Sequence, residues 1–207
     1  MINLPKKAAA STAVILSALL PALTFFLTST PAEDLANSGL PTHVVSDAVP
    51  AFDADDVSDD VLWLARCAYS ETKRPHEQEL VMWVIRNRVE TGYRGATSYE
   101  GAVTDPYQFS AFNPGSSKRM LYTTLDAQSD AAGWQRALDI AHAVYYSPAS
   151  ARPFDATTRH FYSERSMVGG AAPTWAVGHR PIRPNAAARI DARRFRFYKG
   201  VANVLHF

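Results

Sequence analysis

The chain of 207 residues has a single cysteine, Cys67, so it cannot form an intramolecular disulfide. It also lacks a Cys/His spacing typical of a metal site, a Gly-x-Ser-x-Gly motif around Ser110 and any internal repeat. Cys67 stands in an apolar helical pattern, where we expect a buried structural thiol and no nucleophile. The sequence therefore predicts neither a metal nor another cofactor.

Positive charge is absent from residues 33–60, which contain eight Asp and Glu and no Lys or Arg. Residues 61–207 contain 19 Lys and Arg against 12 Asp and Glu, so a basic body follows an acidic leader. A basic surface favours a polyanion, such as nucleic acid, anionic lipid or an anionic cell-wall polymer. With 47% hydrophobic residues, the body can bury a core without disulfides.

The N-terminus narrows this choice. Lys6 and Lys7 precede an apolar run from Ala8 to Leu27, and small and polar residues follow up to Ala32. This order is typical of a secretory signal peptide, although a run of about 20 residues is also long enough for an uncleaved membrane anchor. We predict that residues 1–32 are one or the other, and that the protein is exported to the periplasm or cell envelope. Export argues against nucleic acid as the partner, and membrane contact is expected only through this segment if it is uncleaved.

The rest of the chain predicts an α+β fold, mainly α. Residues 33–57, rich in Pro, Ser, Asp and Ala, indicate an acidic flexible linker, and residues 58–207 a single folded domain. Capping residues, apolar spacing, prolines and glycines indicate its elements. We expect helices over residues 59–71, from 75 to about 91, near 99–103 and over 130–146, and strands over residues 159–162 and 195–198. The expected outline is a helical lobe followed by a small loop-and-strand lobe.

Three glutamates lie within nine residues: Glu71, Glu77 and Glu79. Glu71 ends the first predicted helix, where the negative end of the helix dipole and burial beside Tyr69 favour a protonated carboxyl, although Lys73 and Arg74 oppose this. Such a carboxyl can protonate a leaving glycosidic oxygen. The alternative is a solvated glutamate in a charged turn. Glu77 and Glu79 fall in the first turn of the next helix, where their charge is sufficiently explained by helix capping.

Two further segments combine aromatic and polar side chains. Residues 106–113 alternate aromatics with amides and include Gln108, Phe109 and Ser110. This mixture suits sugar recognition, and packed core aromatics are the alternative. The second segment contains His160 and is followed by Trp175. His160 could be a ligand, a base or a structural histidine.

Several short blocks occur in a fixed order between residue 61 and about residue 200. They are Leu64-Ala65-Arg66 with Tyr69-Ser70-Glu71, Arg86-Asn87-Arg88-Val89, Gln108-Phe109-Ser110, His160-Phe161-Tyr162 with Pro173-Thr174-Trp175, and Arg196-Phe197-Tyr198. Together they resemble the SleB-type cell wall hydrolases, the family of the spore-cortex lytic enzymes. The resemblance implies a small lysozyme-like fold that cuts the glycan strands of peptidoglycan, with Glu71 as the catalytic glutamate. We accordingly expect substrate contacts from Tyr69, Gln108, Phe109, Ser110, His160, Tyr162 and Trp175.

The chain departs from the family pattern after Glu71. Thr72-Lys73-Arg74-Pro75 stands where the family has Ala-Arg-Gly-Glu, so the second family glutamate has no clear equivalent. We expect a lytic transglycosylase that cuts between N-acetylmuramic acid and N-acetylglucosamine with one Glu as acid and base. The alternatives are lysozyme-type hydrolysis, which would use a second carboxylate, and non-catalytic peptidoglycan binding. The candidates for that second carboxylate are Glu77, Glu79, Asp105 and Glu164.

Overall fold

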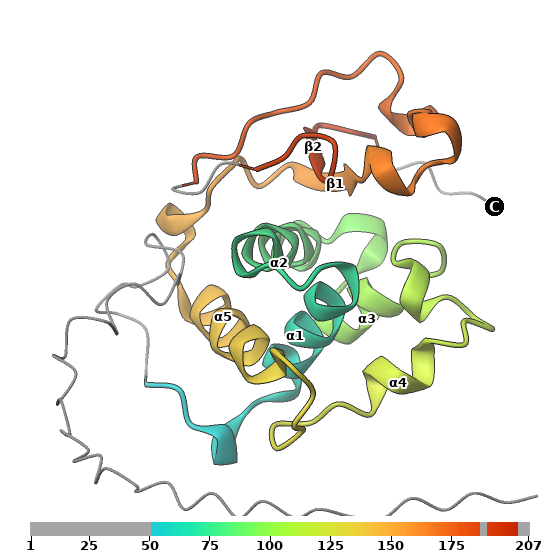
Figure 1. The fold of residues 1–207 in the computed structure, drawn as a ribbon. Coiled ribbons are helices and arrows are strands. Elements are labelled where there is room, and N and C mark those ends of the chain that lie inside the picture. Colours follow the sequence, from blue (N-terminus) through green and yellow to red (C-terminus); the bar gives the residue numbers. More distant parts are fainter. Residues whose placement is uncertain (1–50, 187–189, 203–207) are drawn as a thin grey trace, which may run out of the picture. The chain divides into compact units, whose positions relative to one another are not determined.

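The computed structural model describes residues 51–186 and 190–202. The predicted signal peptide or anchor lies outside these residues, as do residues 33–50 of the predicted linker. The described residues form an α+β fold, mainly α, in which the helices precede a two-stranded antiparallel sheet (Figure 1). The elements are α1 (Asp59–Glu71), α2 (Pro75–Glu90), α3 (Tyr99–Thr104), α4 (Arg119–Thr123), α5 (Trp134–Tyr146), β1 (Thr158–Tyr162) and β2 (Arg196–Lys199).

The first two predicted helices are confirmed, and local signals explain their ends. The Ser58 hydroxyl accepts a hydrogen bond from the backbone N–H of Val61 at 3.4 Å and caps α1. Pro75 is the first residue of α2, where its missing N–H costs nothing. Gly92 follows α2 with a φ of 59°, a left-handed conformation that glycine adopts without strain.

One helix boundary and one short helix differ from the prediction. The helix predicted over residues 130–146 begins only at Trp134, because Gly133 before it has a φ of 77° and interrupts the helical backbone. The short helix α4 was not predicted; it occupies part of the region between α3 and α5 and contains no buried residue. Short segments of weak amphipathic pattern give little periodicity from which a helix could be predicted.

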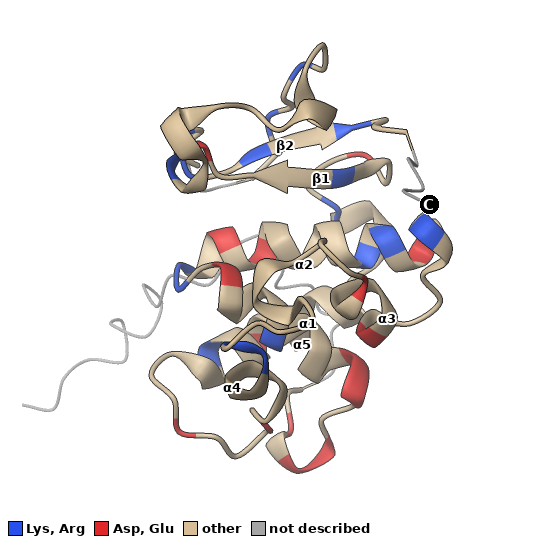
Figure 2. Cartoon of the chain, turned by 90° about the vertical axis from the view of Figure 1, so that its right-hand side faces the viewer, with Lys and Arg blue, Asp and Glu red and all other residues tan. Residues whose placement is uncertain are grey.

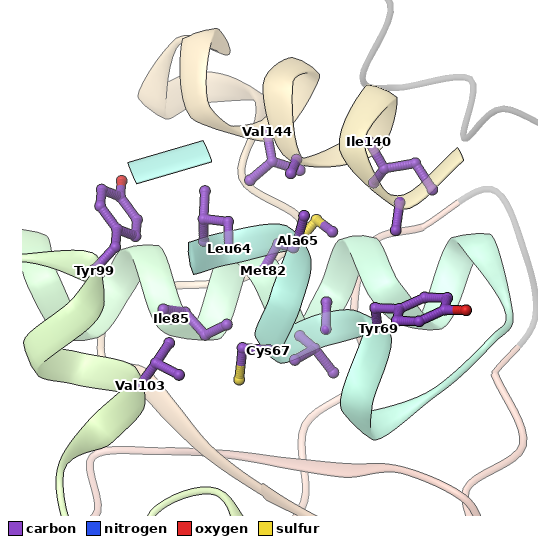
Figure 3. Packing of buried hydrophobic residues seen from close by; sticks show 14 of the residues in the cluster. Leu64, Ala65, Cys67, Tyr69, Met82, Ile85, Tyr99, Val103, Ile140 and Val144 are labelled. Atoms are coloured by element: carbon purple, nitrogen blue, oxygen red, sulfur yellow. The ribbon is translucent and has the colours of Figure 1, made fainter. Parts of the chain in front are cut away.

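The core lies between α1, α2, α3 and α5. Figure 3 shows Leu64 and Ala65 of α1 beside Met82 of α2 and Val144 of α5, and all four side chains are fully buried. Cys67 belongs to the same cluster and is fully buried, which confirms the prediction of a buried thiol. Each large apolar side chain buried in this way stabilises the fold by about 1.5–3 kcal/mol.

The described end of the predicted linker is part of this packing. Phe52 contacts the core, and its ring centroid lies 5.5 Å from that of His142 in α5. A short 3₁₀ helix, Ala54–Asp56, then leads to α1. The folded part therefore includes residues before Ser58.

The two predicted strands are confirmed as an antiparallel pair, in which His160 faces Tyr198 and Tyr162 faces Arg196. The sheet is held against α2 by the side-chain amide of Asn87, which donates to the backbone oxygen of Thr158 at 2.8 Å. In β1 the alternate residues Thr158, His160 and Tyr162 are buried. No helix in the described part of the chain is long and apolar enough to cross a membrane.

Candidate active site

Glu71, the last residue of α1, lines a cavity of about 550 Å³. The cavity is bounded by α2, by the loop after α3, by β1 and the segment that follows it, and by the residues before β2. Besides Glu71, its lining includes Arg88, Tyr107, Gln108, Ser110, Asn113, Tyr162, Arg165 and Arg194. The structure thus brings together Glu71, Gln108, Ser110 and Tyr162 from the predicted site.

Burial raises the pKa of Glu71 to about 7, against the opposing effect of the positively charged Arg88. Desolvation disfavours the charged carboxylate, and a nearby cation favours it. The carboxyl therefore exchanges its proton near neutral pH. This is the property that a group needs in order to donate a proton and take it back within one reaction cycle.

Arg88 of α2 lines the Glu71 cavity, although it was not among the site residues predicted from the sequence. It is only 5% exposed, and its Nε donates to the backbone oxygen of Arg159 at 2.8 Å. The guanidinium carbon lies 4.8 Å from the ring centroid of Phe109. These contacts hold a buried positive charge at the wall of the Glu71 cavity, where it stabilises the carboxylate form.

Two further cavities adjoin the first. One, of about 470 Å³, shares Arg88, Tyr107, Gln108 and Phe161 with the Glu71 cavity and is also lined by predicted residues His160 and Trp175. The other, of about 450 Å³, shares Ser110 and Asn113 with it. The shared lining residues show that the Glu71 cavity adjoins each of the other two, and we refer to the three cavities together as the groove.

His160 is held by its neighbours in the second cavity. Its Nε2 lies 2.8 Å from the Tyr93 hydroxyl, and its ring centroid is 5.0 Å from that of Trp175. Burial, followed by the charges of Arg88 and Arg159, lowers the pKa of His160 to about 3. The imidazole is therefore neutral at physiological pH and serves to position Tyr93 and Trp175.

Two predicted substrate residues, Tyr69 and Phe109, are not brought to these cavities. Tyr69 is buried in the helical core, where its hydroxyl donates to the backbone oxygen of Ala132 at 2.9 Å and its ring packs on Trp134. Phe109 is 2% exposed and packs beneath Arg88 and against Phe161. Phe109 thus supports two cavity-lining residues from behind, whereas Tyr69 packs in the core, and neither of them lines one of the three cavities.

The interpretation of Glu77 and Glu79 as helix-capping charges was incomplete, because both are 1% exposed. Glu77 accepts two hydrogen bonds from Arg194, at 2.8 and 3.0 Å, and one from the Thr72 hydroxyl at 2.6 Å. Although burial acts to raise the pKa of Glu77, these partners outweigh it and lower the pKa. A solvent-exposed cap would not have needed a partner 117 residues away.

The other candidate carboxylates are also engaged in ion pairs. Asp105 pairs with Arg94 at 2.5 Å, and Glu164 pairs with Arg196 and, at 3.7 Å, with Arg193. Among the described residues that line the three cavities, Glu71 is the only acid, whereas Arg88, Arg94, Arg165, Arg194 and Lys118 are basic. Figure 2 shows Lys and Arg on both strands of the adjoining sheet.

Other cavity residues were missed for identifiable reasons. Arg88 belongs to the block Arg86-Asn87-Arg88-Val89, which resembles the SleB-type pattern. Its position along α2 does not indicate that its side chain lines the same cavity as Glu71. Tyr107 and Asn113 lay in the aromatic and amide segment without being selected as site residues. Arg165 lies in a three-residue 3₁₀ helix, Glu164–Ser166, and Arg194 in the turn before β2, where no periodicity indicates which way a side chain points.

Comparison of the chain with family models, with curated proteins and with solved structures found no match. Within residues 51–186 and 190–202, no group of three or more His, Cys, Asp or Glu side chains is placed to hold a metal ion.

Proposed function

We propose that the protein cleaves the glycan strands of peptidoglycan between N-acetylmuramic acid and N-acetylglucosamine, as an exported lytic transglycosylase of lysozyme-like fold. The observation that carries this proposal is Glu71, an acid with a pKa of about 7, in the middle of a groove formed by three adjoining cavities. A groove with several consecutive cavities suits a polymer better than a small molecule. Its basic lining suits a polymer that carries carboxylates on its peptide stems.

In this mechanism, Glu71 first donates its proton to the glycosidic oxygen, and the bond between that oxygen and C1 of the muramic acid breaks. The resulting carboxylate then accepts the proton of the C6 hydroxyl of the same sugar while the C6 oxygen bonds to C1. The products are a 1,6-anhydro sugar and a new sugar hydroxyl, and Glu71 has recovered its proton. Arg88 stabilises the carboxylate between the two steps.

A single carboxyl is sufficient for this route. Hydrolysis by the usual two-carboxylate mechanism needs a second carboxylate about 5–9.5 Å from the first. Glu77, Asp105 and Glu164 are paired with arginines, and the described lining of the Glu71 cavity contains no other acid. These observations favour transglycosylation over lysozyme-type hydrolysis.

The test is the release of soluble fragments from purified peptidoglycan, with mass spectrometry of the products. We expect anhydromuramyl ends from the wild type and a rate lower by about 10²-fold or more for Glu71→Gln, because general acid–base catalysis contributes about 10²–10⁴-fold. Glu100→Gln, which removes an exposed carboxylate from α3, should leave the rate unchanged.

Other outcomes would support hydrolysis or non-catalytic binding in place of transglycosylation. Reducing ends in the products would establish hydrolysis. Equal rates for Glu71→Gln and the wild type would overturn the role of Glu71. Binding of peptidoglycan without any release by the wild type would indicate a non-catalytic binding protein.

A further inference from the structure

Tyr107, in the loop between α3 and the short 3₁₀ helix Ser110–Phe112, combines two unusual properties. Its side chain is 84% exposed, although it is large and aromatic. Its backbone has a φ of 66°, in the left-handed region that residues with a Cβ adopt only at an energetic cost. Strained residues of this kind persist where the surrounding structure holds them, and they cluster at functional sites.

Polar contacts of neighbouring residues hold this conformation. The backbone N–H of Tyr107 donates to Asn113 Oδ1 at 2.8 Å, and the N–H of Gln108 donates to the backbone oxygen of Asp105 at 3.2 Å. Asp105 is itself fixed by its ion pair with Arg94. The loop is therefore anchored on both sides of Tyr107, so the exposed ring is not simply the tip of a loose segment.

The position of Tyr107 relates it to the proposed chemistry. It lines both the Glu71 cavity and the neighbouring cavity that contains His160 and Trp175. Within the described part of the chain, no other aromatic ring packs against it. An exposed ring at the boundary of two cavities offers an apolar face to a ligand that passes from one to the other.

We propose that Tyr107 is a substrate-binding residue on which the sugar next to the cleaved bond stacks. This inference rests on the proposed function for the identity of the ligand, a glycan of N-acetylated sugars. Glu71 acts on one sugar in the middle cavity, and the adjoining sugar lies over the Tyr107 ring and extends toward Trp175. The strained backbone keeps the ring in this position before the substrate arrives, which reduces the ordering cost of binding.

The first test measures binding apart from cleavage. In the Glu71→Gln background, the affinity for insoluble peptidoglycan is measured by co-sedimentation. Tyr107→Ala should weaken binding by about tenfold, because it removes the apolar ring face on which the sugar stacks. Tyr107→Phe, which keeps the ring, should stay within about twofold of the parent. Tyr146→Ala removes another exposed tyrosine, which lies on α5 and lines none of the three cavities, and should have no effect.

The second test concerns the strained backbone. Tyr107→Gly removes the Cβ that makes a φ of 66° costly, whereas Tyr107→Ala retains it. We expect the glycine variant to melt about 2–4 °C higher than the alanine variant while binding peptidoglycan equally weakly. A melting temperature no higher than that of the alanine variant would contradict the claim that the backbone of Tyr107 is strained.

The failures of the two proposals are distinguishable. If Tyr107→Ala binds as tightly as its parent, or if the parent does not bind peptidoglycan at all, the role of Tyr107 is overturned. If the wild type binds peptidoglycan but releases no fragments, the catalytic proposal fails. A tenfold loss of affinity in Tyr107→Ala would still support the binding role of Tyr107.

Discussion

At the scale of single residues, Glu71 depends on a balance between burial and one neighbouring cation. Burial alone would hold the proton too firmly for the return step, because the carboxylate would be too costly to form. Arg88, in the wall of the same cavity, lowers this cost through its positive charge. The proposed acid is therefore tuned by a residue on a different helix.

This balance predicts the pH dependence of Arg88 variants. In Arg88→Met, the loss of the positive charge should raise the pKa of Glu71 further, because a cation favours the charged form. Since the proposed mechanism begins with the protonated carboxyl, the pH above which activity declines should move upward from about 7. The measurement is kcat/KM for fragment release as a function of pH.

Arg88→Lys is the matched control, since it retains a cation at the same position. The pH above which the activity of Arg88→Lys declines should lie close to that of the wild type. Its maximal rate can still be lower, because the contact with Arg159 is lost. If the pH midpoint of the activity decline in Arg88→Met equals that of the wild type or is lower, the proposed role of Arg88 is contradicted.

At the scale of elements, the connection between α1 and α2 is held by a small polar network. The Gln78 side chain donates to the backbone oxygen of Thr72 at 2.9 Å, and Thr72 shares Glu77 with Arg194. Arg194 lies in the segment before β2, so the network joins the end of the proposed catalytic helix to the sheet lobe. The three residues of this connection, 72–74, lie where the sequence departs from the pattern of the SleB-type hydrolases.

This network predicts a pH-dependent loss of stability. Arg194→Met should lower the free energy of unfolding by about 3 kcal/mol at pH 7, because it leaves the buried Glu77 carboxylate without its main partner. The pKa of Glu77 is lowered below the ordinary 4.5, so the stabilisation is present above that pH and is lost as the pH falls below it. Urea denaturation at pH 7 and below pH 4 measures both effects.

The double variant Glu77→Gln with Arg194→Met is the control for the buried charge. It should be more stable at pH 7 than Arg194→Met alone, since no carboxylate is then left unpaired. Equal losses in the two variants would show that Arg194 contributes through packing only.

The elements themselves were largely predictable, whereas their long-range partners were not. Ser58, Pro75 and Gly92 act within a few residues, so the ends of α1 and α2 could be inferred from the sequence. The burial of Glu77 depends on Arg194, and the placement of Tyr69 depends on the carbonyl of Ala132, which no local pattern indicates. For the same reason Gln108 and Ser110 could be expected near the site from their composition, while Arg88, Arg165 and Arg194 required the fold.

At the scale of the whole molecule, charge is divided along the chain. The body carries 19 Lys and Arg against 12 Asp and Glu, and the described lining of the three cavities contains five basic residues and one acid. Positive charge concentrated in a groove raises the local concentration of an anionic polymer and increases its rate of association. In the proposed function, this effect would act before any specific contact with a sugar.

Binding to peptidoglycan should therefore depend on salt. We expect the affinity of Glu71→Gln to fall steadily as the ionic strength rises from about 0.01 to about 1 M, because the screening length shortens from about 30 to about 3 Å. Chitin, an uncharged polymer of N-acetylglucosamine, should show little of this dependence. Affinity for peptidoglycan that is independent of salt would contradict a role for the basic lining.

Arg194 links the Glu71 cavity with the network that holds the connection between α1 and α2. It lines the cavity of Glu71, and it also binds Glu77, which accepts a further hydrogen bond from the hydroxyl of Thr72, the residue that follows Glu71 in the chain. A substrate carboxylate that binds Arg194 would compete with Glu77 for the same guanidinium group. If the proposed substrate binds there, occupancy of the groove would be transmitted through Arg194 and Glu77 to the backbone next to Glu71.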